Sequence, residues 1–146
     1  MLTTPHPSAP PKHPRTVFEL ALRVYWEDTD AGGVVFYANY LKFFERARTE
    51  WLRSRGVEQQ VLRQTTGAIF VVTQTQVQYH APARLDDQLS VSVLLQRRAG
   101  ASMAFTQHAR RGALLLAEGR IDIACVDSQS FKPRRLPQPI LDALAL

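Results

Sequence analysis

Apolar and polar residues alternate along several short stretches of this chain, which is the pattern of strands that bury one face. In residues 17–25 every second position is apolar, from Phe18 to Val24, and this predicts the first strand. Further strands are predicted at residues 68–80, 88–98, 103–111 and 113–127. Short turns separate these stretches, which favours an antiparallel meander in which each strand pairs with the one before it.

Residues 39–55 follow a helical pattern, because their apolar positions recur three and four residues apart and Gly56 follows as a terminator. The apolar stripe comprises Tyr40, Phe44, Ala47 and Trp51, with Leu41 and Leu52 beside it. The opposite side is charged, and its spacing predicts ion pairs of Glu50 with Arg46 and with Arg53. We expect residues 139–146 to form one or two last turns of helix.

The order of elements is therefore β-α-β-β-β-β, an α+β protein in which a curved antiparallel sheet wraps one long helix in two layers. Such a sheet has two exposed edges, and pairing with a second copy would cover one of them, so we expect a homodimer. Residues 1–15 hold five prolines and no apolar run, which predicts a disordered tail rather than a secretory signal. Residues 16–146 are long enough for a single domain with one core.

The amino-acid composition of the chain excludes several classes of protein. One cysteine in 146 residues excludes a disulfide framework and a zinc site of several thiolates, and Cys125, in an apolar strand, is expected as a buried structural thiol. No apolar run is long enough to span a bilayer, so we expect a cytoplasmic protein. The net charge of +5 and the pI of about 9.9 point to an anionic partner. Nucleic acid is disfavoured, because the arginines are scattered and the aromatic residues belong to the helix and strands.

The loop EDTDAGG, residues 27–33, is the most promising place for chemistry. Signatures of serine nucleophiles, phosphate loops and dinucleotide sites are absent, and no histidine has a metal-ligand partner at suitable spacing. The loop gathers carboxylates just before the helix, where free N–H groups can stabilise developing negative charge. Either one carboxylate acts as a base or nucleophile towards a carbonyl group, or these residues only shape the turn and complement the helix dipole. The three carboxylates are Glu27, Asp28 and Asp30.

The segment VYWEDTDAGGVVFYANYLKFFERARTEWL, residues 24–52, resembles the signature of hotdog-fold acyl-CoA thioesterases of the 4-hydroxybenzoyl-CoA thioesterase type. It is more similar to the branch associated with the bacterial Tol–Pal system, as are YHAPARLDDQL at 79–89 and CVDSQSFKPRRLP at 125–137. The resemblance covers roughly residues 17–140. It implies hydrolysis of an acyl-CoA thioester to a free acid and coenzyme A, with no metal and no cofactor beyond the coenzyme A of the substrate.

The resemblance also assigns roles to single residues. Asp30 matches the catalytic carboxylate, which acts either as nucleophile or as general base on water. The backbone N–H of Tyr37 matches the group that polarises the thioester oxygen, and Asp28 and Gly33 match positions that shape the loop. In this family the site lies at a dimer interface, so the resemblance implies a homodimer or a tetramer of dimers.

Two departures from the family pattern bear on chemistry. Many Tol–Pal-associated members carry histidine where this chain has Tyr37, and because a tyrosine ionises near ~10, only the backbone role carries over. This chain has Gly32 where the 4-hydroxybenzoyl type has an alanine. The resemblance therefore does not decide whether the substrate carries an aryl group. Another hotdog branch carries its acid on the helix, which makes Glu45 and Glu50 weaker candidates; we interpret both as salt-paired surface residues.

Basic residues would bind the phosphates of coenzyme A. The resemblance places such a pair at Arg97 and Arg98, with a second candidate cluster at Arg134 and Arg135; solvated surface charge is the alternative for both. Arg110 and Arg111 flank a turn, and we expect them to be solvated. A different class of function also stays open, a scaffold or regulatory hotdog protein that binds an acyl carrier protein or an envelope complex and hydrolyses little.

Overall fold

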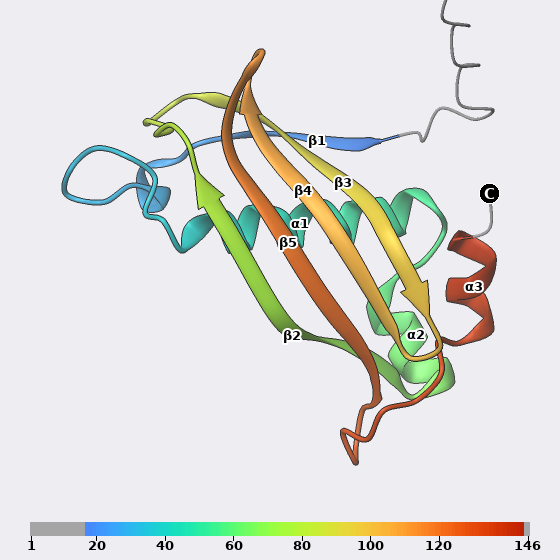
Figure 1. Ribbon diagram of the computed structural model, residues 1–146. Helices are drawn as coiled ribbons and strands as arrows, with labels where there is room; N and C mark the ends of the chain where they lie inside the picture. The colour runs from blue at the N-terminus through green and yellow to red at the C-terminus, as the bar shows by residue number, and fades with distance from the viewer. Residues whose placement is uncertain (1–16, 145–146) are drawn as a thin grey trace, which may run out of the picture.

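The computed structural model describes residues 17–144 (Figure 1). The predicted disordered tail, residues 1–15, lies outside the described residues. The elements are β1 (Phe18–Arg23), a 3-10 turn η1 (Trp26–Asp28), α1 (Asn39–Ser54), α2 (Gln59–Thr66), β2 (Ala68–Tyr79), β3 (Gln88–Ala99), β4 (Ser102–Arg111), β5 (Leu114–Asp127) and α3 (Gln138–Leu144). All predicted strands and the long helix are confirmed. The short helix α2 was not predicted, because only Leu62 of its eight residues is buried and the apolar pattern is too brief.

The five strands form one antiparallel sheet in the order β1-β3-β4-β5-β2. The meander is confirmed for β3, β4 and β5, but the expectation that β2 pairs with β3 is wrong. β2 pairs with β5 instead, in a register that runs from Ala68 opposite Asp127 to Tyr79 opposite Ala117. The segment 80–87 is too long for a tight hairpin and crosses the end of the sheet before β3 begins. β1 and β2 are therefore the two edge strands.

The helix α1 lies across one face of this sheet, with the core between them (Figure 1). The predicted stripe is confirmed, since Tyr40, Phe44, Ala47, Trp51 and Leu52 are all buried. The predicted faces of the strands are confirmed as well, from Leu89 to Val93 in β3 and from Ile121 to Cys125 in β5.

Two side chains of α1 differ from the prediction. Phe43 is fully buried, because it lies three residues after Tyr40 and four before Ala47 and so belongs to the stripe. Leu41 lies at the flank of the helix and is 42% exposed.

A glycine sets the distance between α1 and the sheet. Gly119 lies in the middle of β5, buried under the ring of Phe44. A Cβ atom at this position would lie 2.7 Å from Cε2 and 3.0 Å from Cδ2 of Phe44. Real Cβ atoms do not come so close to a ring carbon, so the helix approaches the sheet this closely because β5 has no side chain there.

The polar side of α1 agrees in part with the prediction. The ion pair of Glu50 with Arg53 is confirmed. Within residues 17–144 no ion pair joins Glu50 to Arg46, whose guanidinium lies 6.0 Å from the centroid of the Phe43 ring instead. Cys125 is a buried thiol as predicted, and burial raises its pKa. None of the described helices has the length and apolar character needed to cross a membrane.

Candidate active site

The loop between β1 and α1 lies at one end of the sheet, beside the connection from β2 to β3 (Figure 1). Val24, the first residue of the loop, is fully buried and anchors it. Its N–H donates to the carbonyl of Asp87 at 2.9 Å, and its carbonyl accepts from the N–H of Asp86 at 3.0 Å. The loop therefore starts from a fixed point on the segment that leads into β3.

Asp28 fixes both ends of the loop. The side chain is 6% exposed, and its Oδ2 accepts a hydrogen bond from the Tyr25 N–H at 2.8 Å. The Asp28 carbonyl accepts from the Phe36 N–H at 3.0 Å and from Nδ2 of Asn39 at 2.8 Å. Asn39 is the first residue of α1, so Asp28 joins the start of the loop to the start of the helix.

Asp30 lies at the turn in the middle of the loop. Its Oδ1 accepts hydrogen bonds from the N–H of Gly32 at 2.8 Å and of Val34 at 3.4 Å. Its carbonyl accepts from the N–H of Gly33 at 3.0 Å, and Gly33 has a φ of 79°, a conformation that costs glycine no steric strain. Within residues 17–144 no group donates to Oδ2 of Asp30. One carboxylate oxygen is thus held by the backbone while the other stays open.

Tyr37 precedes α1 and is exposed. Its N–H donates to no acceptor among the described residues, whereas the neighbouring Phe36 and Asn39 N–H groups both donate to backbone carbonyls. The Tyr37 carbonyl accepts a hydrogen bond from the Tyr79 hydroxyl at 2.9 Å. An unpaired N–H two residues before the first residue of a sixteen-residue helix is a suitable donor for a developing oxyanion.

Tyr37 also lines a shallow groove of about 310 Å³. It is lined by Val35, Tyr37, Tyr40, Tyr79, His80, Ala81 and Pro82. Burial raises the pKa of Tyr40, and burial followed by the nearby Tyr37 raises the pKa of Tyr79. Both phenols therefore stay protonated at neutral pH, and the Tyr79 hydroxyl remains a hydrogen-bond donor.

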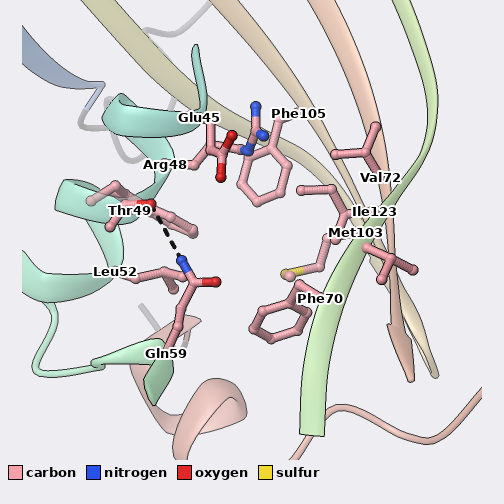
Figure 2. A pocket seen from close by; sticks show the side chains of 12 residues that line it. Glu45, Arg48, Thr49, Leu52, Gln59, Phe70, Val72, Met103, Phe105 and Ile123 are labelled. Carbon is pink, nitrogen blue, oxygen red and sulfur yellow. Dashed lines mark hydrogen bonds between the residues drawn. The ribbon is translucent and has the colours of Figure 1, made fainter. Parts of the chain in front are cut away.

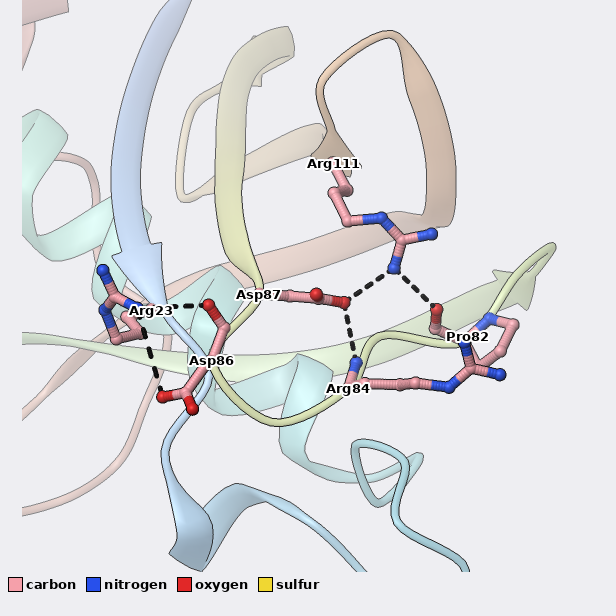
Figure 3. Close-up of polar contacts among 6 residues, drawn as sticks. All are labelled: Arg23, Pro82, Arg84, Asp86, Asp87 and Arg111. Carbon is pink, nitrogen blue, oxygen red and sulfur yellow. Dashed lines mark hydrogen bonds and ion pairs between the residues drawn. The ribbon is translucent and has the colours of Figure 1, made fainter.

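A cluster of polar contacts holds the segment that includes Pro82, one of the residues lining the groove (Figure 3). Oδ2 of Asp87 accepts from the Arg84 N–H at 2.8 Å and from Nη1 of Arg111 at 2.6 Å. Arg111 also donates to the carbonyl of Pro82 at 3.3 Å. The hydrogen bond from the Arg84 N–H and the contact with Arg111 lower the pKa of Asp87. The expectation that Arg111 is merely solvated is wrong, because the crossing segment 80–87 brings Asp87 within reach of it.

The four arginines expected at the phosphates of coenzyme A lie at the opposite end of the sheet. Arg97 is exposed and lies nine residue steps along β3 from Gln88, at the loop end of the strand, which is about 30 Å at ~3.3 Å per step. Arg98 is exposed beside it. Arg134 is half-buried, and its Nη1 donates to the carbonyl of Thr66 at 2.6 Å, just before β2. Arg135 is exposed. Within one copy of the chain, none of these side chains lines the groove.

Two further predictions concern acidic and metal-binding groups. Glu50 is salt-paired as expected, but Glu45 forms no ion pair with any residue in the range 17–144. Over the same range, His, Cys, Asp and Glu form no group of three or more that could hold a metal ion. The loop and groove thus combine a carboxylate, a free backbone N–H and an apolar wall, which suits attack on a polarised carbonyl. Tyr79 and Arg111 were not found from the sequence, since their contacts depend on the pairing of β2 with β5.

Comparison with known proteins agrees with this geometry. Residues 24–144 match the thioesterase-like superfamily. The acyl-CoA thioester hydrolase YbgC of Escherichia coli O6:H1 is 46% identical over 127 residues, which cover 86% of this chain and 94% of that protein. The acyl-CoA thioesterase YbgC of Haemophilus influenzae is 43% identical over 123 residues, which cover 84% of this chain and 90% of that protein.

Solved structures lead to the same family. A probable thioesterase from Bartonella henselae has a TM-score of 0.79 at 35% identity and covers 84% of this chain and 100% of its own. Slr0204, a 1,4-dihydroxy-2-naphthoyl-CoA thioesterase from Synechocystis, has a TM-score of 0.82 over 88% of this chain and 96% of its own; at 24% identity it shows the fold alone. The predicted hotdog fold is confirmed, and the chain belongs to the thioesterase-like superfamily.

Proposed function

We propose that this protein hydrolyses acyl-CoA thioesters, with Asp30 as the reacting carboxylate. The observation that carries the proposal is the pairing, on one loop, of an open Asp30 oxygen with the unpaired N–H of Tyr37. The thioester oxygen would accept from this N–H, which stabilises the negative charge that develops when the carbonyl is attacked. YbgC relatives with the same activity in their names support the substrate class.

The balance of the reaction is the same for both possible roles of Asp30. As a general base Asp30 takes a proton from water and the hydroxide oxygen bonds to the acyl carbon. The C–S bond then breaks, and Asp30 gives the proton to the departing thiolate. As a nucleophile it first forms an acyl-aspartyl anhydride and releases the thiolate, and water then cleaves the anhydride. Each route consumes one water and yields a free carboxylic acid and the thiol of coenzyme A. No metal enters either route, because protein groups supply both the carboxylate and the oxyanion donor.

A second copy of the chain would complete the site. β2 is an edge strand of twelve residues, and Val72 on it is 52% exposed. Antiparallel pairing of two β2 strands would place the Ala68 end of one copy beside the Tyr79 end of the other. Arg134, bound to Thr66 near the Ala68 end, would then approach the groove of the second copy. This arrangement supports a role for Arg134 in binding phosphates.

The test is hydrolysis of a panel of acyl-CoA thioesters, with release of the free thiol as the readout. Asp30→Asn should fold normally and lose two or more orders of magnitude in kcat, the scale of a lost base or nucleophile. Glu27→Gln is the matched control, because it removes an exposed carboxylate of the same loop and should keep activity within about two-fold of wild type. Full activity of Asp30→Asn would refute the assignment. No turnover by wild type on any thioester would favour the scaffold function.

Several expectations remain part of this proposal. Coenzyme A presents the acyl group, with an acyl carrier protein as the open alternative. The enzyme works in the cytoplasm as a homodimer or a tetramer of dimers, in association with the Tol–Pal system. The buried state of the single cysteine suits a reducing compartment. Sedimentation of the full chain measures the oligomeric state directly.

A further inference from the structure

A second pocket, of about 320 Å³, lies between α1 and the sheet (Figure 2). Neither Asp30 nor Tyr37 lines it. Its sheet wall is apolar and is formed by Phe70, Val71, Val72, Met103, Phe105 and Ile123. Its helix wall also carries polar side chains, among them Glu45, Arg48, Thr49 and Gln59. The pocket therefore offers an apolar slot together with hydrogen-bonding groups, the combination typical of small-molecule sites.

Arg48 is the unusual member of this lining. It is 9% exposed, and its Nη1 donates to Oε1 of Gln107 at 2.8 Å. Gln107 is fully buried, and its Nε2 donates to the carbonyls of Phe44 at 3.0 Å and of Ser92 at 3.3 Å. Since the amide nitrogen is committed to these carbonyls, the amide oxygen is oriented towards Arg48. Burial lowers the pKa of Arg48 to about 10, so the guanidinium stays charged at neutral pH.

Most hydrogen-bond donors of Arg48 have no partner among the described residues. A guanidinium has five N–H groups, and the bond to Gln107 uses one. Among the described residues no fully buried side-chain nitrogen lacks a partner, so the remaining nitrogens of Arg48 keep some contact with solvent. Arg48 lines the pocket, so a ligand in it would lie beside this side chain. A ligand that fills the pocket with hydrocarbon alone would displace that water and leave the donors unpaired.

The charge of the pocket favours a neutral ligand group. Glu45 lies three residues before Arg48 on the same helix and lines the same pocket. Its carboxylate opposes the positive charge of Arg48, so the two together are close to neutral. An uncharged oxygen can accept a hydrogen bond from Arg48 without meeting repulsion from Glu45, whereas a carboxylate would meet it.

We propose that this pocket binds the distal part of the acyl group and that Arg48 selects acyl chains carrying an uncharged oxygen there, a hydroxyl or keto group. The proposal rests on the proposed thioesterase function. An unsubstituted chain of equal length would forfeit a hydrogen bond to a charged donor, which corresponds to roughly a 10- to 100-fold lower kcat/KM.

The experiment compares matched acyl-CoA thioesters of six to twelve carbons whose distal end carries a hydrogen, a hydroxyl, a keto or a carboxyl group. Wild type should prefer the hydroxyl or keto member by about 10-fold or more at one chain length at least. Arg48→Met should bring that ratio close to one while hydrolysis of the unsubstituted chain continues. Arg46→Met, which changes an exposed arginine on the same helix, should keep the wild-type ratio.

Each outcome decides the matter. A wild-type ratio below about two at every length, a preference for the carboxyl member, or a preference that survives in Arg48→Met would overturn the proposal. If Arg48→Met does not fold, the same ratios are measured in Arg48→Gln, and a wild-type preference that survives there would overturn the proposal. If wild type hydrolyses no thioester, the thioesterase function fails, and titration calorimetry with free hydroxy and unsubstituted acids tests the pocket by itself.

Discussion

Replacing Gly119 by alanine tests how closely α1 rests on the sheet. The new Cβ would lie 2.7 Å from Cε2 of Phe44 and 3.2 Å from Cδ1 of Ile121. Both side chains are almost wholly buried, so neither can swing into solvent, and the helix must shift. Overpacking of this kind costs about 1–3 kcal/mol. The lower entropy of the unfolded alanine chain returns about 0.4–1 kcal/mol. The net loss of about 1–2 kcal/mol lowers the Tm by roughly 3–10 °C.

The assay is thermal unfolding followed by circular dichroism, with Gly100→Ala as the matched control. A Cβ atom added at Gly100 would meet no other atom within 4 Å, so this variant should match wild type or exceed it slightly. A double-mutant cycle isolates the clash: Phe44→Leu should cost clearly less in the Gly119→Ala background than in wild type. Additive effects of the two substitutions, or an unchanged Tm for Gly119→Ala, would refute the reasoning.

Three other substitutions test the contacts around the two pockets. Tyr79→Phe removes the hydroxyl that holds the carbonyl before α1, and kcat should fall about 2- to 10-fold with little change in KM, measured by steady-state hydrolysis. Gln107→Leu removes the acceptor of Arg48 and should cost about 1–3 kcal/mol in chemical denaturation. The Arg84 N–H is the main cause that lowers the pKa of Asp87 below its ordinary value of 3.8. The ionised carboxylate therefore stabilises the fold above about pH 4, and this stabilisation is lost as the pH falls further. Between pH 4 and pH 3 the Tm of Asp87→Asn should decline less than that of wild type.

Features that depend on local sequence were predictable. Alternation over six to fourteen residues located every strand, and the three- and four-residue spacing located α1, because each pattern follows from burial of one face of a single element. The loop around Asp30 is similarly local: its turn closes between Asp30 and Val34, and Gly33 has the positive φ that the turn requires. A short motif therefore carries most of this geometry.

Features that depend on contacts between residues distant in sequence were not predictable. Nothing in the alternation of β2 distinguishes pairing with β3 from pairing with β5, since both would bury the same face. That choice determines what meets at the groove, where the Tyr79 hydroxyl reaches the carbonyl of Tyr37 and Arg111 reaches Asp87. The sequence thus located the candidate loop around Asp30, but not the contacts that Tyr79 of β2 and Arg111 of β4 make near it.

Arg48 shows a signal of a different kind. It lies four residues after Phe44 and three before Trp51, so the helical pattern assigns it to the buried stripe, where an apolar residue is expected. A charged side chain at such a position lowers stability unless its donors are satisfied, and Gln107 satisfies only part of them. When a charged side chain on an apolar stripe keeps hydrogen-bond donors that the fold does not pair, we expect a ligand to supply the missing partner. A charged residue at a position where the stripe predicts an apolar one, here Arg48, is therefore the sequence feature that marks the second pocket.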